Sequence, residues 1–334
     1  MHMKKAAVII LTLGMLLLSA CSGGPEQSES YALNTICKQT VYGDKARQAA
    51  GDVNAMLTDI TNTMSVSEGS EVYEINEAAP NEVRVSQQTA DVISAGLEIA
   101  DKTNGAFDPA IGPVTALWDI TGDPRVPEQD ELKGALALVD YKGITIDGTN
   151  VSLEKSGMRI DLGGIAKGYA ADKAVDIYKS YGIKSALLDL GGNIYAYGKK
   201  PDGGDYRIGI RDPLGEPGET AAVVSVSNTS VVTSGVYERF FESGGVKYHH
   251  IFDPKTGYPA DNGLVSVTVI CKSSTRADGL STALFVMGLD EGLKFSKAQG
   301  DVQAVFITED REIYVTDGLK ESVEITNEAY TLKS

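Results

Sequence analysis

The residues with the clearest chemical meaning lie in the stretch 161–172, which reads DLGGIAKGYAAD. Two glycines separate a strand-like run at 151–160 from a helix-like run at 166–181. Lys167 falls in the first helical turn, where a cation is unfavourable because a helix N-terminus is already positive. A bound anion resolves this conflict, because free backbone N–H groups, the helix dipole and Lys167 all point at it. The stretch therefore predicts a phosphate site, although its spacing fits neither a Walker loop nor a dinucleotide-binding fingerprint.

A second pair of residues offers oxygen ligands for a metal ion. Asp278 and Thr282 stand four residues apart, so a helix places both side chains on one face. A carboxylate and a hydroxyl suit Mg²⁺, which keeps several waters and shares phosphate oxygens. A zinc or iron site is disfavoured, because His249 and His250 are the only histidines after residue 20 and no paired cysteine motif is present. The alternative is that Asp278 caps a helix and Thr282 bonds to its own backbone.

His250 is a candidate general base. It ends a strand-like run and precedes the tight-turn sequence IFDPKTG at 251–257. A histidine in this position can accept a proton or bind phosphate. It can equally be a strand residue with a satisfied hydrogen bond, so this motif alone leaves both interpretations open.

The N-terminus has the pattern of a lipoprotein signal peptide. Two lysines precede an apolar run at 6–18, and the sequence LSAC that ends at Cys21 matches a lipobox. A secretory signal and a transmembrane helix are the alternatives, but the apolar run is short for a membrane span. We predict a signal peptide over 1–20, lipid attachment at Cys21 and a flexible tether over 21–30.

The formal net charge is −16, so the sequence lacks the excess of basic residues that is typical of a nucleic-acid-binding protein. An acidic chain of this kind suits solubility and the binding of divalent cations. About three hundred residues follow the predicted signal peptide, enough for one large domain or two closely packed lobes. Cys37 and Cys271 are the cysteines after Cys21, and the sequence leaves open whether they pair.

The elements that must position these residues mix without a regular order. Hydrophobic periodicity predicts helices at 45–64, 89–102, 127–139, 166–181, 276–288 and 290–299. It predicts strands at 31–41, 141–160, 185–190, 206–210, 222–227, 230–233, 248–252, 264–271, 303–307 and 312–316. Strands and helices that do not alternate favour an α+β fold, with mixed or antiparallel sheets and flanking helices.

Taken in order, the motifs resemble those of the ApbE family of FAD:protein FMN transferases over about residues 31–318. They are Ser70-Glu71 with Asn76, GAFDP at 105–109, Gly112-Pro113 with Leu117-Trp118, the stretch 161–172, LGGN at 190–193, Ser234-Gly235, 250–257, and Ala277-Asp278 with Ser281-Thr282-Ala283. The family's reaction splits the FAD pyrophosphate with Mg²⁺, transfers FMN to a threonine hydroxyl of an acceptor protein, and releases AMP. A pyrophosphate needs cations and backbone donors, which the stretch 161–172 supplies.

The resemblance assigns roles to individual residues. His250 falls on the catalytic histidine, and Asp278 is the second catalytic residue. Metal-ligand positions fall on the Gly164 carbonyl, Asp278, Ser281 and Thr282. FAD-contact positions fall on Leu33, Asn76, Ala106, Phe107, Asp108, Asp161, Lys167 and Phe252.

Two departures from the family pattern concern the flavin ring. The sequence Leu33-Asn34-Thr35 replaces a Met/Phe-Gly-Thr type of sequence, and 64–69 lacks the aromatic residue that often precedes Ser70. Stacking on the isoalloxazine ring is therefore left to another residue. Asn76 lies where the family sets the balance between FMN transfer and FAD hydrolysis.

The resemblance implies a two-lobed single domain over 31–334, related to the T-fold. It also implies an enzyme that uses FAD and Mg²⁺ and modifies an exported acceptor protein on threonine. With the lipobox, this places the protein on the extracytoplasmic face of a bacterial membrane, held by its lipid anchor. The alternatives are a Mg²⁺-dependent FAD pyrophosphatase that gives FMN and AMP, and a non-catalytic FAD-binding lipoprotein.

Overall fold

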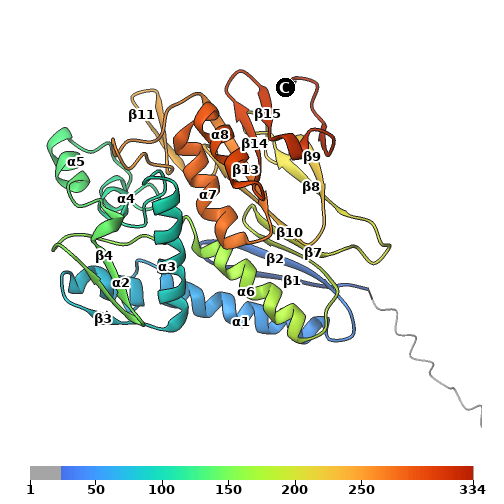
Figure 1. Ribbon diagram of the computed structural model, residues 1–334, viewed down its shortest axis with the longest axis horizontal. Helices are drawn as coiled ribbons and strands as arrows, with labels where there is room; N and C mark the ends of the chain where they lie inside the picture. The colour runs from blue at the N-terminus through green and yellow to red at the C-terminus, as the bar shows by residue number, and fades with distance from the viewer. Residues whose placement is uncertain (1–23, 334) are drawn as a thin grey trace, which may run out of the picture.

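The computed structural model describes residues 24–333 (Figure 1). The predicted signal peptide and the lipidation site at Cys21 lie outside the described residues. Within the described part, no helix combines the length and the apolar character that crossing a membrane requires.

The largest element is a nine-stranded sheet with the order β1-β2-β6-β7-β10-β13-β14-β15-β17. Its pairings are antiparallel except for the parallel pair β15 and β17. The strands are β1 (Glu26–Ala32), β2 (Thr35–Tyr42), β6 (Ser185–Leu190), β7 (Asn193–Gly198), β10 (Thr229–Gly235), β13 (Leu264–Cys271), β14 (Gln303–Thr308), β15 (Glu312–Val315) and β17 (Thr331–Lys333).

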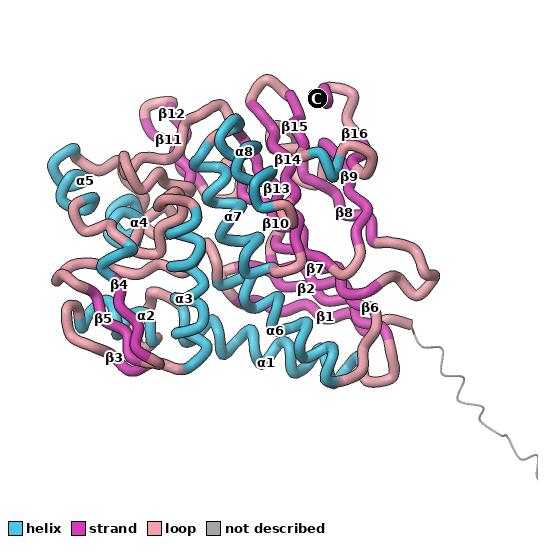
Figure 2. Tube along the Cα trace, in the orientation of Figure 1, coloured by secondary structure: helices cyan, strands magenta, loops and turns pink. Residues whose placement is uncertain are grey.

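Helices cover one face of this sheet, and a small sheet packs on the other (Figures 1 and 2). The helices are α1 (Ala46–Met64), α2 (Glu71–Ala78), α3 (Gln87–Lys102), α4 (Gly112–Trp118), α5 (Gln129–Leu136), α6 (Ala166–Ser180), α7 (Ser274–Met287) and α8 (Leu289–Gln299). The small sheets are β8 (Tyr206–Arg211), β9 (Thr220–Val226) and β16 (Val323–Ile325); β3 (Val83–Arg84), β4 (Ile144–Asp147) and β5 (Asn150–Leu153); and β11 (Phe240–Ser243) and β12 (Val246–His249). The predicted α+β class is confirmed.

The prediction of a flexible tether over 21–30 is wrong for residues 26–30, which form most of β1. These residues are all polar, but they are held in place. Ser30 donates to Asn54 of α1 over 3.0 Å, and Asn54 donates to Ser28 over 2.8 Å. The strand also pairs along its length with β2. Side-chain partners on α1 therefore satisfy a polar strand that composition alone suggested was a linker.

Helices α2 and α4 and strand β7 are among the elements that lie where the sequence predicted neither a helix nor a strand. Helix α4 begins with Gly112-Pro113, and proline is tolerated in the first turn of a helix because the N–H it lacks has no partner within the helix there. Helix α2 begins after Ser70, whose hydroxyl accepts from the backbone N–H of Tyr73. Strand β7 follows the glycine pair at 191–192 and joins β6 to β10. Within residues 24–333, Cys37 and Cys271 are buried and do not pair with each other.

Helices α6 and α7 cap each other, and this contact positions the site. Asp278 of α7 accepts the backbone N–H of Gly168 in the first turn of α6, over 2.8 Å. In return, Asp172 of α6 accepts the backbone N–H groups of Ser274 and Thr275 at the start of α7, over 2.8 and 3.0 Å. Gly168 permits the close approach, because a Cβ there would lie 2.2 Å from the carbonyl oxygen of Ser274. Each helix dipole is thus met by a carboxylate from the other helix.

Candidate active site

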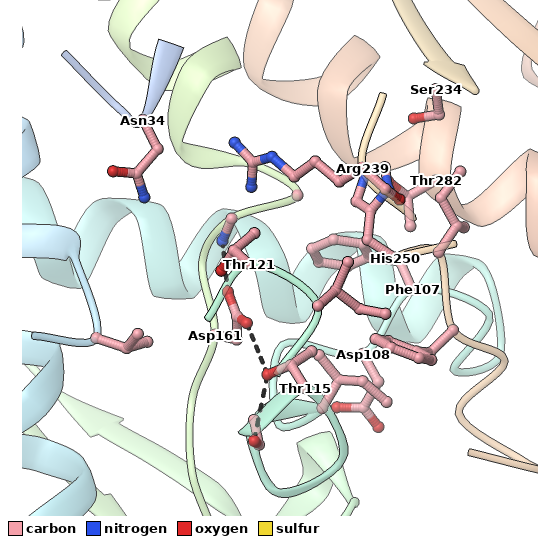
Figure 3. Close-up of a pocket in the computed structure, with 18 of the residues that line it drawn as sticks. Asn34, Phe107, Asp108, Thr115, Thr121, Asp161, Ser234, Arg239, His250 and Thr282 are labelled. Carbon is pink, nitrogen blue, oxygen red and sulfur yellow. Dashed lines mark hydrogen bonds between the residues drawn. The ribbon is translucent and has the colours of Figure 1, made fainter. Parts of the chain in front are cut away.

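A cavity of about 710 Å³ opens where the loops before α4 and α6 meet α7 and the segment around His250 (Figure 3). Most of the predicted site residues line it. They are Asn76, Ala106, Phe107, Asp108, Asp161, Gly164, Lys167, His250, Phe252, Asp278 and Thr282. Residues from distant parts of the sequence therefore meet in one cavity.

The start of α6 and the middle of α7 form one corner of the cavity. Lys167 Nζ lies 3.8 Å from Asp278 Oδ1 and 3.4 Å from the carbonyl oxygen of Gly163. The Asp278 carboxylate thus partly offsets the unfavourable interaction between the Lys167 charge and the positive N-terminus of α6. Gly164 and Thr282 are neighbours here, because a Cβ at Gly164 would lie 3.5 Å from Thr282 Oγ1.

The donor atoms of this corner fit a hard cation. Asp278 is 4 % exposed, and Gly168 occupies only one of its two carboxylate oxygens. Within residues 24–333, no group of three or more histidine, cysteine, aspartate or glutamate side chains could hold a metal, although Glu238 lines the same cavity near enough for its charge to interact with that of Asp278. The oxygens that meet at this corner are those of the Asp278 carboxylate, the Thr282 hydroxyl and backbone carbonyls such as that of Gly164, a set that suits Mg²⁺ with retained waters.

Ser281, also predicted as a metal ligand, has its hydroxyl bonded away from this corner. It is fully buried and is not among the residues that line the cavity. Its hydroxyl donates to the carbonyl oxygen of Asp278 over 2.8 Å and pairs with the Ser234 hydroxyl over 2.7 Å. Neighbouring residues of a helix point about 100° apart, so Ser281 faces β10 while Thr282 faces the cavity. Ser281 thus supports the position of Asp278.

The loop before α6 is fixed by two polar side chains. Asp161 accepts from the Thr115 hydroxyl of α4 and from the backbone N–H of Gly163, each over 2.8 Å (Figure 3). Asn76 of α2 makes two bonds to the backbone of Ile160, donating to its carbonyl over 3.0 Å and accepting its N–H over 2.6 Å. Both side chains therefore hold the glycine turn in place, and the Asn76 amide uses one N–H donor and its oxygen for this contact.

The loop at 106–108 forms the wall opposite α6. The Phe107 ring lies against Gly164, where an added Cβ would be 3.1 Å from it. Asp108 accepts the backbone N–H groups of Ala110 and Tyr141, over 2.7 and 3.1 Å. Burial raises the Asp108 pKa to about 6, against the effect of these two bonds. Asp108 thus orders the loop that presents Ala106 and Phe107.

His250 enters the cavity in a form that can accept a proton. Its backbone N–H and its Nδ1 both lie near the carbonyl oxygen of Arg239, at 3.1 and 3.3 Å. A carbonyl only accepts, so Nδ1 carries the proton and Nε2 keeps its lone pair. Burial, together with the cations Arg239 and Lys167, lowers the His250 pKa to about 3. The imidazole is therefore neutral at physiological pH.

His249 has a structural role instead. Its Nε2 donates to the carbonyl of Ala260 over 3.1 Å, and its ring packs edge-on against Phe285.

An aromatic cluster supports the His250 side of the cavity. Trp118 is fully buried, and its Nε1 donates to the carbonyl of Gly257 over 2.8 Å. Its ring lies 5.6 Å from that of Phe252, which lines the cavity. Trp118 thus has the core role that is common for a lone tryptophan, and it holds the turn at 253–257 against α4.

Leu33, predicted as a flavin contact, is not among the residues that line the cavity. It occupies the turn between β1 and β2 with a positive φ of 52°, and its side chain packs against the main core. Its backbone N–H donates to the Thr61 hydroxyl over 2.9 Å. The next residues, Asn34 and Thr35, line the cavity in its place. The single predicted strand at 31–41 concealed this turn.

The comparisons with known proteins decide the family. Residues 33–306 match the model of the ApbE family.

The chain belongs to the ApbE family.

Its relatives match over most of their length. The FAD:protein FMN transferase of Treponema pallidum is 35 % identical over 98 % of this chain and 99 % of that protein. The FAD:protein FMN transferase of Klebsiella pneumoniae is 37 % identical over 74 % of this chain and 78 % of that protein. The crystal structure of the ApbE protein of Thermotoga maritima superposes with a TM-score of 0.84 at 35 % identity, and covers 89 % of this chain and 99 % of that one. The flavin transferase ApbE of Vibrio cholerae gives a TM-score of 0.80 at 28 % identity, with 90 % and 99 % covered.

Two charged residues of this ApbE site, Glu238 and Arg239, were missed in the sequence. Both line the cavity, and both follow the predicted Ser234-Gly235 motif by a few residues in the sequence. The signal was present, because two adjacent opposite charges precede the apolar pair Phe240-Phe241. Glu238 is exposed to the cavity. The cavity shields its carboxyl from bulk water, and this desolvation raises the Glu238 pKa to about 7, although the cations Lys167 and Arg239 act in the opposite direction.

Glu238 predicts a pH dependence of FAD binding. The carboxyl is neutral below its pKa and negative above it, so raising the pH through about 7 places a negative charge beside the pyrophosphate. We expect FAD affinity to fall several-fold between pH 6 and pH 8 in the parent protein and to stay flat in Glu238→Gln. Titration of FAD binding at several pH values measures this, and a parallel dependence in both proteins would contradict it.

Lys167 predicts a selective loss of affinity. Removal of a charged hydrogen-bond donor costs about 1.5–3 kcal/mol, so we expect Lys167→Ala to weaken FAD about ten- to a hundredfold. Riboflavin lacks the pyrophosphate, and its affinity is expected to change little. Parallel titrations with the two flavins measure the difference, and equal weakening would mean that Lys167 has only a structural role.

Proposed function

We propose that this chain is an FAD:protein FMN transferase that moves FMN from FAD to a threonine hydroxyl of an acceptor protein and releases AMP. One observation carries the proposal. A neutral His250 with a free Nε2 shares a cavity with the cations Lys167 and Arg239 and with the oxygen ligands of Asp278 and Thr282. The imidazole can activate a hydroxyl. The two cations can hold a pyrophosphate directly, and the oxygen ligands can do so through a bound metal ion.

In this reaction the hydroxyl oxygen of the acceptor forms a bond to the FMN phosphorus, and the bond from that phosphorus to the AMP oxygen breaks. The hydroxyl proton passes to Nε2 of His250, while the Arg239 carbonyl keeps Nδ1–H in place. The bound pyrophosphate offsets the positive charge of Lys167 and Arg239, so the His250 pKa is expected to rise toward a value that suits a base.

The remaining residues bind and orient the substrate. Lys167 and Arg239 take up pyrophosphate charge, while Asp161 and Asn76 fix the turn that lies beside it. Asp278, Thr282 and the Gly164 carbonyl would hold Mg²⁺, which neutralises charge on phosphate oxygens as AMP departs.

The test uses the chain from Cys21 onward with FAD, Mg²⁺ and a panel of threonine-bearing extracytoplasmic domains from the same bacterium. Covalent flavin on a threonine of one domain, with one AMP released per flavin bound, is the expected result. Release of FMN and AMP without labelling would instead indicate an FAD pyrophosphatase. Unchanged FAD would indicate a flavin-binding protein.

We also propose that Cys21 carries a lipid that holds the enzyme on the extracytoplasmic face of a bacterial membrane. The lipobox that ends at Cys21 supports this location, because a lipobox directs lipid attachment to an exported protein. An enzyme at this location requires an acceptor that is also exported. Cys21→Ser is expected to move the protein from the membrane fraction to the soluble fraction. Unchanged membrane association would contradict the anchor.

A further inference from the structure

The hairpin β11–β12 forms a two-stranded sheet of its own and projects from the body of the molecule (Figure 2). Its inner face packs on the aromatic cluster, with Phe241 and Tyr248 stacked at 5.4 Å and Trp118 5.3 Å from Tyr248. Its other face carries His249, which is buried against Phe285, and Phe240, the cross-strand partner of His249, which is 42 % exposed, with Lys247 Nζ 3.8 Å from its ring centroid. The core thus covers this face at His249 but leaves much of the Phe240 ring accessible on β11.

Both strands of the hairpin lead directly into the cavity. Arg239 precedes β11, His250 follows β12, and the two residues are joined by the hydrogen bond from His250 N–H to the Arg239 carbonyl. Anything bound along the hairpin therefore lies within a few residues of the proposed base.

The register shows which backbone groups are free. In an antiparallel ladder, hydrogen-bonded pairs alternate with pairs whose N–H and C=O groups point outward. The pair Arg239 and His250 is hydrogen-bonded. In the next pair, Phe240 and His249, the backbone N–H and C=O groups therefore point away from the partner strand, and the same holds for the pair Glu242 and Lys247. Just after the end of β12, the Ala260 N–H donates to the Ile251 carbonyl, and the Ala260 carbonyl accepts from the His249 ring, so a chain segment lies beside that end of β12. Within the described residues, the outward N–H groups of Phe240 and Glu242 have no backbone partner, so the edge of β11 is open.

We propose that this edge binds the acceptor protein: an extended, threonine-bearing segment adds to β11 as a third strand, with an apolar side chain against Phe240. The inference rests on the proposed function, because that reaction requires a protein chain to reach His250. Strand addition supplies main-chain hydrogen bonds that tolerate different sequences, while the contact at Phe240 selects the segment. A strand on this edge ends at Arg239, so its next residues enter the cavity.

Two substitutions test the edge and the ring separately, using the acceptor domain labelled in the panel above. Glu242→Pro removes an outward N–H and blocks a third strand, yet proline is tolerated at such an edge position. Phe240→Asp removes the apolar contact. We expect each to raise the KM for the acceptor about tenfold or more, as for loss of a central interface aromatic, and to leave FAD affinity unchanged. The matched controls are Glu242→Ala, which keeps the N–H, and Leu332→Asp on β17, which is 39 % exposed and belongs to the nine-stranded sheet and not to the hairpin.

The emission of Trp118 reports whether the hairpin still packs in each variant, because it is the only tryptophan. A direct measurement uses the parent protein: the amides of Phe240 and Glu242 should exchange with solvent rapidly, and the acceptor, but not FAD, should protect them. Unprotected amides, or a KM within about twofold of the parent in both variants, would overturn the docking inference. If the parent labels no domain, the proposed function fails and the docking inference fails with it.

Discussion

Asp278→Asn is expected to abolish FMN transfer while the protein stays folded. Asparagine keeps an oxygen that can accept the Gly168 N–H, so the cap of α6 survives. It loses the negative charge that a divalent cation requires. Charge neutralisation by a bound metal contributes several kcal/mol to such a transition state, so we expect the transfer rate to fall about a thousandfold or more. The rate of flavin labelling at saturating FAD and acceptor, over a range of Mg²⁺ concentrations, measures this effect.

Asp278→Ala is the informative comparison. It removes the charge and the cap together and leaves the buried Gly168 N–H without an acceptor, which costs about 1–3 kcal/mol. Thermal unfolding should therefore separate the two variants, with the alanine protein less stable and the asparagine protein close to the parent. Transfer by Asp278→Asn at more than a tenth of the parent rate would refute the metal assignment.

His250→Ala is expected to lose transfer by about a hundred- to ten-thousandfold, the usual contribution of a general base, with FAD affinity retained. A base acts on the chemical step, so the loss should appear in kcat. Added imidazole is expected to restore part of the rate, because the lost side chain leaves space beside Arg239. Single-turnover labelling with preformed enzyme–FAD complex isolates this step.

The pH profile gives an independent check on His250. A base works above its pKa, and in the free enzyme burial and the nearby cations lower that pKa to about 3. Even after bound pyrophosphate raises it, His250 should stay largely deprotonated at neutral pH. At saturating FAD we therefore expect labelling to change little between pH 8 and pH 7 and to decline only in more acidic solution. For the His250→Ala variant of the preceding prediction, labelling at the parent rate, or a rate that added imidazole does not raise, would argue that His250 only positions the substrate.

The sequence predicted the parts of the site that depend on local spacing. Helix α6 begins where the glycine turn and the apolar period place it, and Asp278 and Thr282 share a face because they are four residues apart on α7. The α+β class followed from the irregular order of strands and helices.

Long-range contacts decided the rest. Thr115 holds Asp161 across 46 residues of sequence, and no local pattern announces such a bond. Ser281 and Thr282 are chemically alike, and only the packing of α7 shows that one faces β10 and the other the cavity. Leu33 lies in a turn with positive φ after β1, beside residues that line the cavity, whereas the apolar pattern of 31–41 predicted one continuous strand.

The mutual capping of α6 and α7 has a consequence for which ion the site accepts. The Asp278 carboxylate cannot rotate freely, because one oxygen is committed to the Gly168 N–H, and the two helices cannot separate without exposing both caps. Ca²⁺ prefers six to eight oxygens at 2.3–2.6 Å in an adaptable shell, whereas Mg²⁺ accepts few protein ligands and completes a tight octahedron with water. A fixed carboxylate with a single hydroxyl beside it would therefore favour the proposed Mg²⁺ over the larger ion.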